Sequence, residues 1–210
     1  MKTYWISLYL EISSQDNLKK YGEKAVPIIK SYGGKPVVRG GKLKSFSGPN
    51  VVRTVIWEFP TYNDAMSCHE STEYKSAWTH AEDTTKRIMF IVEGVEQEQI
   101  WLSKNYNIQW VQRRIMKGYI VCVWEKINSE EKLKEYALKA RIAADKYSGI
   151  FIIRGGKNRT NEGINSPRTT VVEFPDYNTA IEFYDSPEYQ EALEVIKGHA
   201  VRHHQIVEGT

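Results

Sequence analysis

Cysteine, net charge and long apolar runs are all scarce in this sequence, and each scarcity excludes a class of protein. The chain has two cysteines, Cys68 and Cys122, and a formal net charge of only +3 over 210 residues. Two cysteines without metal-ligand spacing predict reduced, buried thiols in a cytoplasmic protein rather than a disulfide framework or a metal site. The basic residues are dispersed, so we expect no nucleic acid as a partner.

The longest apolar stretches stay well below the roughly 18 residues that a membrane span requires. The N-terminal segment is apolar after Lys2, but it contains Glu11 and lacks a small-residue cleavage site. This favours a first β-strand over a signal peptide. A hydrophobic content of 41% with 26% charged residues is typical of a folded soluble domain. We therefore expect a cytoplasmic protein with no membrane partner.

What the sequence does contain is an internal repeat. Motifs such as Arg-Gly-Gly, Glu-Phe-Pro and Val-Glu-Gly occur twice, in the same order and without insertions. The matched residues, each 115 positions from its counterpart, include Tyr4 and Tyr119, Tyr21 and Tyr136, Arg39 and Arg154, Glu58 and Glu173, Ser71 and Ser186, and Tyr74 and Tyr189. The pattern predicts a first repeat over 1–95, a linker over 96–117 and a second repeat over 118–210.

Each repeat predicts the element order βαββαβ. Aromatic and β-branched residues indicate the strands, Ser13 or Ser14 and Ser129 are expected N-caps, and glycines mark the helix ends. The predicted ranges after the first helix are a hairpin of 36–46 with 51–59 and of 150–160 with 168–174, second helices over 61–80 and 176–197, and last strands over 87–93 and 203–208. This is the α+β, ferredoxin-like arrangement with both helices on one sheet face.

The other sheet face would be exposed in a lone repeat. We assign Trp5, Tyr9, Val38, Val55 and Trp57 to it, and an apolar face of this size requires cover. The second copy supplies it, so we expect the sheets to pack face to face as an intramolecular pseudo-dimer, with further homodimerisation left open.

The linker contains Trp101, Tyr106 and Trp110, which predict a packed arm or short helix rather than a loose tether.

These motifs resemble the domain of unknown function 1330 family. In the second repeat the resemblance rests on RGGK, VVEFPDYNTAIEFYDSPEYQEAL and IVEG, and in the first on RGGK, VIWEFPTYNDA, STEYKSA and IVEG. It covers both repeats and leaves out the linker. It implies the dimeric α+β barrel fold with small-molecule pockets between sheet and helices. That superfamily includes cofactor-free monooxygenases, isomerases, dechlorinating enzymes and haem-degrading enzymes.

The chain departs from the family pattern where an anionic ligand site could lie. The family's arginine, seven residues after the Ser-x-Glu-Tyr tyrosine, is replaced by Ala81 and Ile196. The acidic residue before the hairpin glycine is kept as Glu162 but is Ser47 in the first copy. The resemblance therefore implies two pockets that are not equivalent.

Arg39 and Arg154 are candidate ligand-binding residues because a guanidinium at a strand end can hold a carboxylate in a bidentate fork. Pairing with Glu58 or Glu173 is the structural alternative. The glycines after each arginine indicate a bulge or bend rather than a phosphate loop, since they join strand to strand.

Glu58 and Glu173 are candidate general bases, with an outward or arginine-paired orientation as the alternative. His69 and Tyr184, which occupy matching positions in the two copies, are further candidate catalytic residues. A lone histidine on a helix is, however, more often a surface residue or a hydrogen-bonded core residue. His199, His203 and His204 have spacing that suits a metal but no matching acidic ligand, so we expect surface histidines and no metal.

The surplus of tyrosine and tryptophan suits both a sheet–sheet interface and a pocket for a planar ligand. The remaining predicted ligand-binding residues are Tyr4, Tyr119, Trp5, Trp57, Ser71, Ser186 and Glu162.

The sequence contains no dinucleotide, Walker or nucleophile-elbow motif. We expect a protein that handles a small organic molecule, in the first place a cofactor-independent enzyme using acid/base chemistry of the isomerase, cyclase or lyase type. A non-catalytic carrier is the main alternative, followed by a cofactor-free monooxygenase or haem-binding protein, with a structural assembly role as a further possibility.

Overall fold

A computed structural model of the protein describes residues 1–95 and 116–210. The predicted packing of Trp101, Tyr106 and Trp110 lies outside these residues.

The two repeats form the same succession of elements. In the first they are β1 (Thr3–Ile12), α1 (Gln15–Ser31), β2 (Lys35–Arg39), β3 (Leu43–Ser47), β4 (Arg53–Phe59), α2 (Tyr62–Glu70), α3 (Thr72–Trp78), a 3-10 turn (Glu82–Thr84) and β5 (Thr85–Glu93). In the second they are β6 (Gly118–Ile127), α4 (Glu130–Lys146), β7 (Ile150–Arg154), β8 (Asn158–Glu162), β9 (Arg168–Phe174), α5 (Tyr177–Asp185), α6 (Pro187–Ile196) and β10 (Ala200–Glu208).

Side-chain caps set the helix starts. Ser14 and Ser129 each accept a hydrogen bond from a backbone N–H three residues on, at 3.2 Å, as predicted. The second helix of each repeat, predicted as continuous, is divided in two at Ser71 and Ser186. Each of these serines ends one helix and caps the next, because its extended backbone interrupts the helical ladder.

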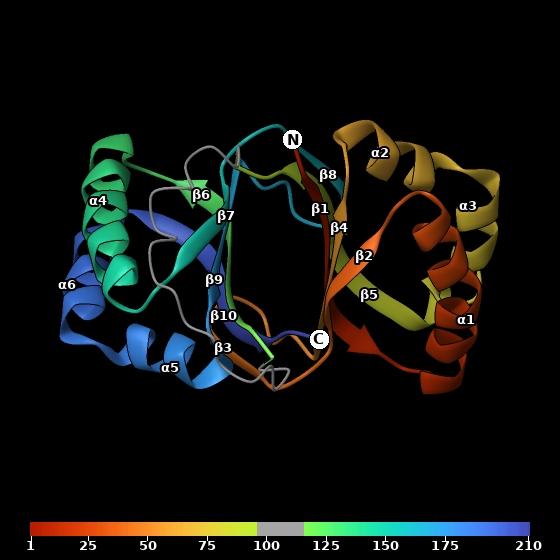
Figure 1. Cartoon of the computed structure of the whole chain (residues 1–210), viewed down its shortest axis with the longest axis horizontal. Helices are drawn as coiled ribbons and strands as arrows, with labels where there is room; N and C mark the ends of the chain where they lie inside the picture. The colour runs from red at the N-terminus through yellow and green to blue at the C-terminus, as the bar shows by residue number, and fades with distance from the viewer. Residues whose placement is uncertain (96–115) are drawn as a thin grey trace, which may run out of the picture.

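Two five-stranded antiparallel sheets face each other at the centre of the molecule, with helices α1–α3 outside one and α4–α6 outside the other (Figure 1). The strand orders are β2-β4-β1-β5-β8 and β3-β10-β6-β9-β7. The α+β fold, with two ferredoxin-like halves packed sheet to sheet, is therefore confirmed.

The predicted hairpins were wrong in one respect, because the repeats exchange strands. β2 pairs with β4 as expected, but β3 crosses to pair with β10, and β8 crosses to pair with β5. The turn lies at the paired glycines, where Gly40 and Gly155 both have φ +75°. Such a φ suits glycine and breaks the strand, so the expected bend there is confirmed.

The sheet faces were also assigned incorrectly for most of the residues named. The inter-sheet core is built mostly from aliphatic residues, and its members are Tyr4, Ile6, Leu8, Val38, Val51, Ile56, Ile88, Phe90, Val92, Tyr119, Val121, Val123, Ile153, Val171 and Val207. Trp5 and Trp57 lie on the opposite face, in the core beneath helices α1–α3. Tyr9 and Val55 also face the helices, in the pocket that Trp5 and Trp57 line. Of the five residues assigned to the interface, only Val38 is there.

Both cysteines are buried free thiols, as predicted. Among the described residues, no helix is long and apolar enough to cross a membrane.

Candidate functional site

Each half has a pocket between its sheet and its helices, and the two occupy equivalent positions. In the first half it lies between β1, β2, β4 and helix α1, and in the second between β6, β7, β9 and helix α4. The inner cavities are narrow, about 70 Å³ and 40 Å³ respectively. The second continues into an outer depression of about 320 Å³ that shares Leu133, Ala137, Arg154 and Arg168 with it.

Two arginines stand where the inner cavity of the second half meets this depression. Arg154 ends β7 and Arg168 begins β9, and both line the two spaces. Arg141 on α4 also lines the outer space. Burial and the neighbouring charges of Arg141 and Arg168 lower the pKa of Arg154 against the attraction of Asp145. Glu130 and Lys134 also line the outer space, so basic residues outnumber acidic ones there. A negatively charged ligand would relieve the repulsion between these basic residues.

The corresponding arginines of the first half are arranged differently. Arg39 lies near the Trp57 ring, and Arg53 donates a hydrogen bond from its guanidinium to the Arg39 carbonyl at 2.8 Å. Arg168 makes no equivalent bond within the described part of the chain. The predicted alternative, an ion pair between Arg39 and Glu58, is wrong. In the backbone register Arg39 lies opposite Val55 and Glu58 lies opposite Lys35, and the Glu58 carboxylate pairs with Lys2.

The inner end of the second pocket holds buried polar groups. His204 is 2% exposed, and its Nε2 has no hydrogen-bond partner among the described residues. Trp124 Nε1 is also buried without such a partner. Burial, together with the charge of Arg202, holds the pKa of His204 well below its usual value, so the imidazole is neutral. Buried polar groups without partners are uncommon and suit a ligand contact.

A pair of tyrosines closes the inner end in both halves. Tyr136 and Tyr189 share a hydrogen bond at 2.8 Å, and Tyr21 and Tyr74 share one at 2.7 Å. An arginine of the last strand then contacts each pair. Arg202 donates to the Tyr136 hydroxyl at 2.9 Å.

In the first half that arginine is Arg87, and its side chain is fully buried. It donates to both carboxylate oxygens of Glu162 at 2.6 and 2.7 Å and lies 3.3 Å above the centre of the Trp78 ring. Glu162 belongs to β8, so the ion pair joins the two repeats. A bidentate pair of this kind is both strong and orienting.

The repeats of this chain match a known family. The family profile described as Domain of unknown function (DUF1330) matches residues 2–95 and again residues 117–210. The chain belongs to the DUF1330 family. Membership confirms the resemblance and the tandem arrangement. No curated protein matches the chain.

Solved structures share the fold of this DUF1330 tandem at low sequence identity. An anthrone oxidase-like protein is 9% identical with a TM-score of 0.55, covering 100% of this chain and 91% of its own. A candidate monooxygenase from Fusobacterium nucleatum is 12% identical with a TM-score of 0.51, covering 99% and 91%. A mutant chlorite dismutase from Candidatus Nitrospira defluvii is 10% identical with a TM-score of 0.50, covering 100% and 91%. These likenesses establish the fold, which is the dimeric α+β barrel type.

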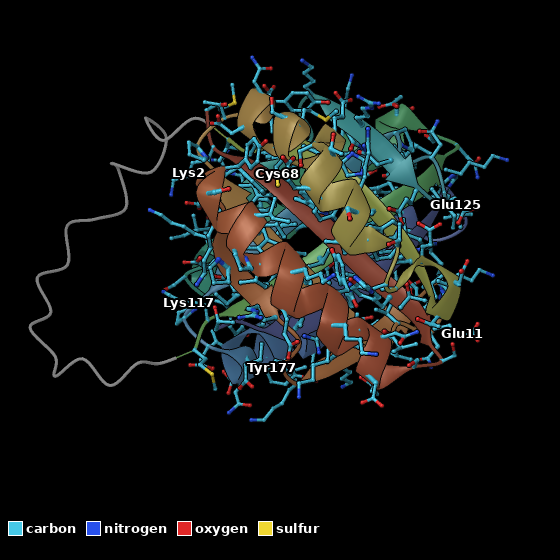
Figure 2. All side chains as sticks on the ribbon, turned by 90° about the vertical axis from the view of Figure 1, so that its right-hand side faces the viewer. Lys2, Glu11, Cys68, Lys117, Glu125 and Tyr177 are labelled. Carbon is cyan, nitrogen blue, oxygen red and sulfur yellow. The ribbon has the colours of Figure 1, made fainter. Side chains whose placement is uncertain are left out.

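The glutamates predicted to be catalytic do not line either pocket. Glu58 accepts a hydrogen bond from Tyr4 at 3.2 Å and pairs with Lys2, and Glu173 accepts one from Tyr119 at 3.0 Å and pairs with Lys117. Both tyrosines belong to the inter-sheet core. Lys2 and Lys117 mark this side of the molecule, opposite Glu11 and Glu125 (Figure 2). The catalytic role of Glu58 and Glu173 remains a prediction without pocket geometry behind it.

His69 and Tyr184 occupy equivalent positions but different surroundings. The His69 ring packs on Trp5 with centroids 5.3 Å apart, and its Nδ1 is 3.3 Å from the Asn161 side-chain nitrogen. Tyr184 stacks on Phe46 at 3.5 Å and lies 5.3 Å from the His204 ring. The structure therefore places Tyr184 beside the second pocket and His69 in a separate depression with Glu162.

Other predicted site residues have structural partners. Ser71 and Ser186 each cap a helix and also donate to a carbonyl of the preceding helix, at 2.8 and 2.7 Å. The positions of the missing family arginine, Ala81 and Ile196, are buried in the apolar core. The expectation of surface histidines was wrong for His203 and His204, since both are buried on β10.

Sequence reasoning missed Arg87, Arg202 and Arg168, and it assigned His204 to the surface rather than to a pocket. A signal was present for the arginines, because Arg87 matches Arg202 and Arg53 matches Arg168 at the repeat offset. His204 matches Met89, so an imidazole stands in the second half where the first half has a thioether.

Acidification is expected to destabilise the protein between pH 6.5 and 4. Burial lowers the pKa of His69 from 6.5 to about 4, against the attraction of Glu162 and Glu70 and together with the repulsion of Arg87 and Arg159. The unfolded chain binds a proton below its pKa of 6.5 and the folded one does not, so stability falls until the folded pKa is reached. Allowing for partial exposure, we expect about 1–2 kcal/mol from His69.

Urea unfolding of the wild type and of His69→Gln at pH 7 and pH 5 measures this contribution. The variant should lose less stability over that interval. Equal losses in both proteins would show that His69 does not carry the effect.

Proposed function

We propose that the second-half pocket binds a flat organic carboxylate and that the protein performs acid/base chemistry on it. The observation that carries the proposal is the pairing of arginines at the mouth with a buried neutral imidazole at the inner end. Arg154 and Arg168 stand at the mouth, and His204 lines the inner end. The ligand class follows from these groups and from the apolar walls between them.

The arginines support a carboxylate. Both guanidinium groups border the same opening, beside Arg141. A guanidinium fork matches a carboxylate with two parallel hydrogen bonds, and the surplus positive charge raises the attraction.

The walls of the pocket favour a ligand with a flat, apolar body. Ile120, Trp124, Phe151, Val172 and Phe183 line the space between the arginines and the tyrosine pair. Because the inner cavity is only about 40 Å³, a slender ring edge fits better than a branched group. The ligand's carboxylate then stays at the wider mouth.

His204 supports the acid/base step. Its low pKa keeps it unprotonated at neutral pH, so Nε2 can accept a proton or a hydrogen bond if that nitrogen is the free one. The same low pKa makes it a weak base. We therefore expect a substrate proton that is already acidic, such as that of an enol or a phenol, passed to Nε2 and returned elsewhere on the substrate.

Replacing Arg154 by Gln is expected to weaken binding of an aromatic carboxylate about tenfold or more, because one charge-assisted bidentate contact is lost. The measurement is calorimetric titration with benzoate and hydroxybenzoates. Arg39→Gln, the equivalent change in the first half, is the matched control and should leave the affinity unchanged. Equal losses in both variants, or no binding to the wild type, would overturn the site.

Oxygenation is a second candidate, favoured by the same imidazole. A phenol or enol that gives its proton to His204 becomes electron-rich enough to react directly with oxygen. The substrate is then the reductant, because a ring CH or a CH2 carbon becomes a carbonyl with one oxygen atom and the second oxygen atom leaves as water. The fold is shared with an anthrone oxidase-like protein and with a candidate monooxygenase. An oxygen electrode separates the two chemistries, since consumption of oxygen with a bound phenol supports oxygenation and isomerisation consumes none. Binding without either reaction would identify a carrier.

A further inference from the structure

Arg87 and Arg202 occupy matching positions in the two repeats, but within the described residues only Arg87 has a counter-ion. Glu162 stands opposite Met89 on β5, and Ser47 stands opposite His204 on β10, so the four positions correspond at the repeat offset. Arg87 and Arg202 are two residues away from these pairs, on the same strands. Glu162 and Ser47 therefore occupy one structural position, beside one structural arginine.

In the first half this position supplies a carboxylate to the arginine. Glu162 accepts two hydrogen bonds from Arg87, at 2.6 and 2.7 Å, while three tyrosine hydroxyls surround the guanidinium at 3.4 Å. The charge of Arg87 is therefore neutralised, and all three of its guanidinium nitrogens have a hydrogen-bond partner.

In the second half the position supplies no carboxylate. The Ser47 hydroxyl donates to the main-chain oxygen of Arg202 at 2.9 Å and so turns to the backbone. The Arg202 guanidinium uses one nitrogen, NH1, for the Tyr136 hydroxyl and the Cys122 sulfur. No carboxylate lies within 4 Å of it in residues 1–95 and 116–210. The Nε and the second terminal nitrogen of Arg202 have no protein acceptor in these residues. In the first half, the same two atoms of Arg87 donate to Glu162.

We propose that Arg202 is the binding site of a small carboxylate anion, which takes the place that Glu162 takes on Arg87. The first half serves as the template, since it shows a carboxylate held at this point by the same side chain. Replacement of Glu by Ser removes both the charge and the bulk that would fill the position. The carboxylate comes from a free ligand of the size of acetate or formate.

The charges around the two arginines differ as well. The depression beside Arg87 is lined by Glu82 and Thr79, whose counterparts in the second half are Lys197 and Glu194, and these two residues form an ion pair at 2.8 Å. The His69 imidazole, which lines the depression beside Arg87, is replaced by the Tyr184 phenol in the second half. A small anion on Arg202 would also offset the charge that helps to depress the pKa of His204.

This site is distinct from the pocket of the proposed function. Arg202 is not among the residues that line that pocket; it contacts the lining residues Tyr136 and Cys122 from the far side of the arginines at the mouth, which it does not touch. The two sites can therefore be tested separately in the same protein.

The experiment titrates the full-length chain with 13C-labelled acetate at constant ionic strength and follows binding by NMR. Ser47→Glu should restore the ion pair, raise the melting temperature without acetate and weaken acetate binding at least tenfold. Ser47→Gln fills the same space without a charge, so it should not raise the melting temperature. Glu162→Ser, the reverse exchange, should add a second acetate site.

Arg154→Gln separates this site from the pocket. The arginines at the mouth would attract acetate too, so the titration is repeated in Arg154→Gln, where carboxylates are lost from the mouth and the acetate that still binds reports Arg202. Acetate binding that persists when Ser47→Glu is added to Arg154→Gln, or that is absent from Arg154→Gln itself, would overturn the assignment to Arg202. If Ser47→Glu does not fold, a crystal of the wild type soaked in acetate decides, since the absence of density on Arg202 would also overturn it.

Discussion

Replacing Glu162 by Gln is expected to destabilise the protein by about 3 kcal/mol, at the lower end of the range for breaking a buried ion pair. The change keeps the side chain's shape but leaves the Arg87 charge without its counter-ion in a site where the arginine side chain is fully buried. The lower end applies because Glu162 itself is 28% exposed. Urea unfolding followed by circular dichroism measures the loss.

Glu70→Gln is the matched control, because Glu70 pairs with Arg159 and so also joins α2 to the exchanged strand β8. Both partners of that ion pair are about half exposed, at 52% and 53%. The expected cost is therefore below about 1 kcal/mol. In addition, Arg87→Met combined with Glu162→Gln should cost less than the two single changes added together. A similar cost for Glu162→Gln and Glu70→Gln would contradict the importance of burial.

Separating the repeats is expected to abolish folding of each half as a monomer. Fragments 1–95 and 117–210 would each expose the inter-sheet core and lose the partner of the strand that they donate, since β3 pairs with β10 and β8 with β5. Exposed apolar faces and unpaired strand edges lead to association or unfolding. Co-expressed fragments should instead assemble one to one, which analytical ultracentrifugation and thermal unfolding can measure.

The homodimers of the fragments supply the control. Two copies of the second fragment would place Glu162 against Arg202, whereas two copies of the first would place Ser47 against Arg87. The second homodimer should therefore be the more stable of the two. A folded monomer of either fragment, with the stability of the whole chain, would show that strand exchange is dispensable.

Local sequence was sufficient for the elements themselves. Ser14 and Ser129 were recognisable as caps because a serine side chain can satisfy the free N–H groups of a helix start. The duplication was visible because matched residues keep one spacing, and two copies of an α+β unit with an apolar sheet face imply that the sheets pack together. These features depend on neighbours in the chain or on the repeat, both of which the sequence displays directly.

The site was less predictable, since its residues converge from strands and helices that are distant in the chain. Glu58 looked like a pocket carboxylate, but the alternation of β4 directs it to the inter-sheet side with Tyr4. Trp5 and Trp57 were placed on the wrong face because both faces of β1 and β4 are apolar, so alternation alone could not tell them apart.

The sequence by itself determined that this protein is a duplicated α+β unit with two diverged halves, because repetition and local propensity are properties of the chain. Only the tertiary structure decided which residue meets which across the repeats. In the sequence, Ser47 and Glu162 are simply two different residues at matching positions. Strand exchange places each of them beside the arginine of the other repeat. Whether a buried charge is neutralised depends on distances between strands far apart in sequence, and those distances exist only in the fold.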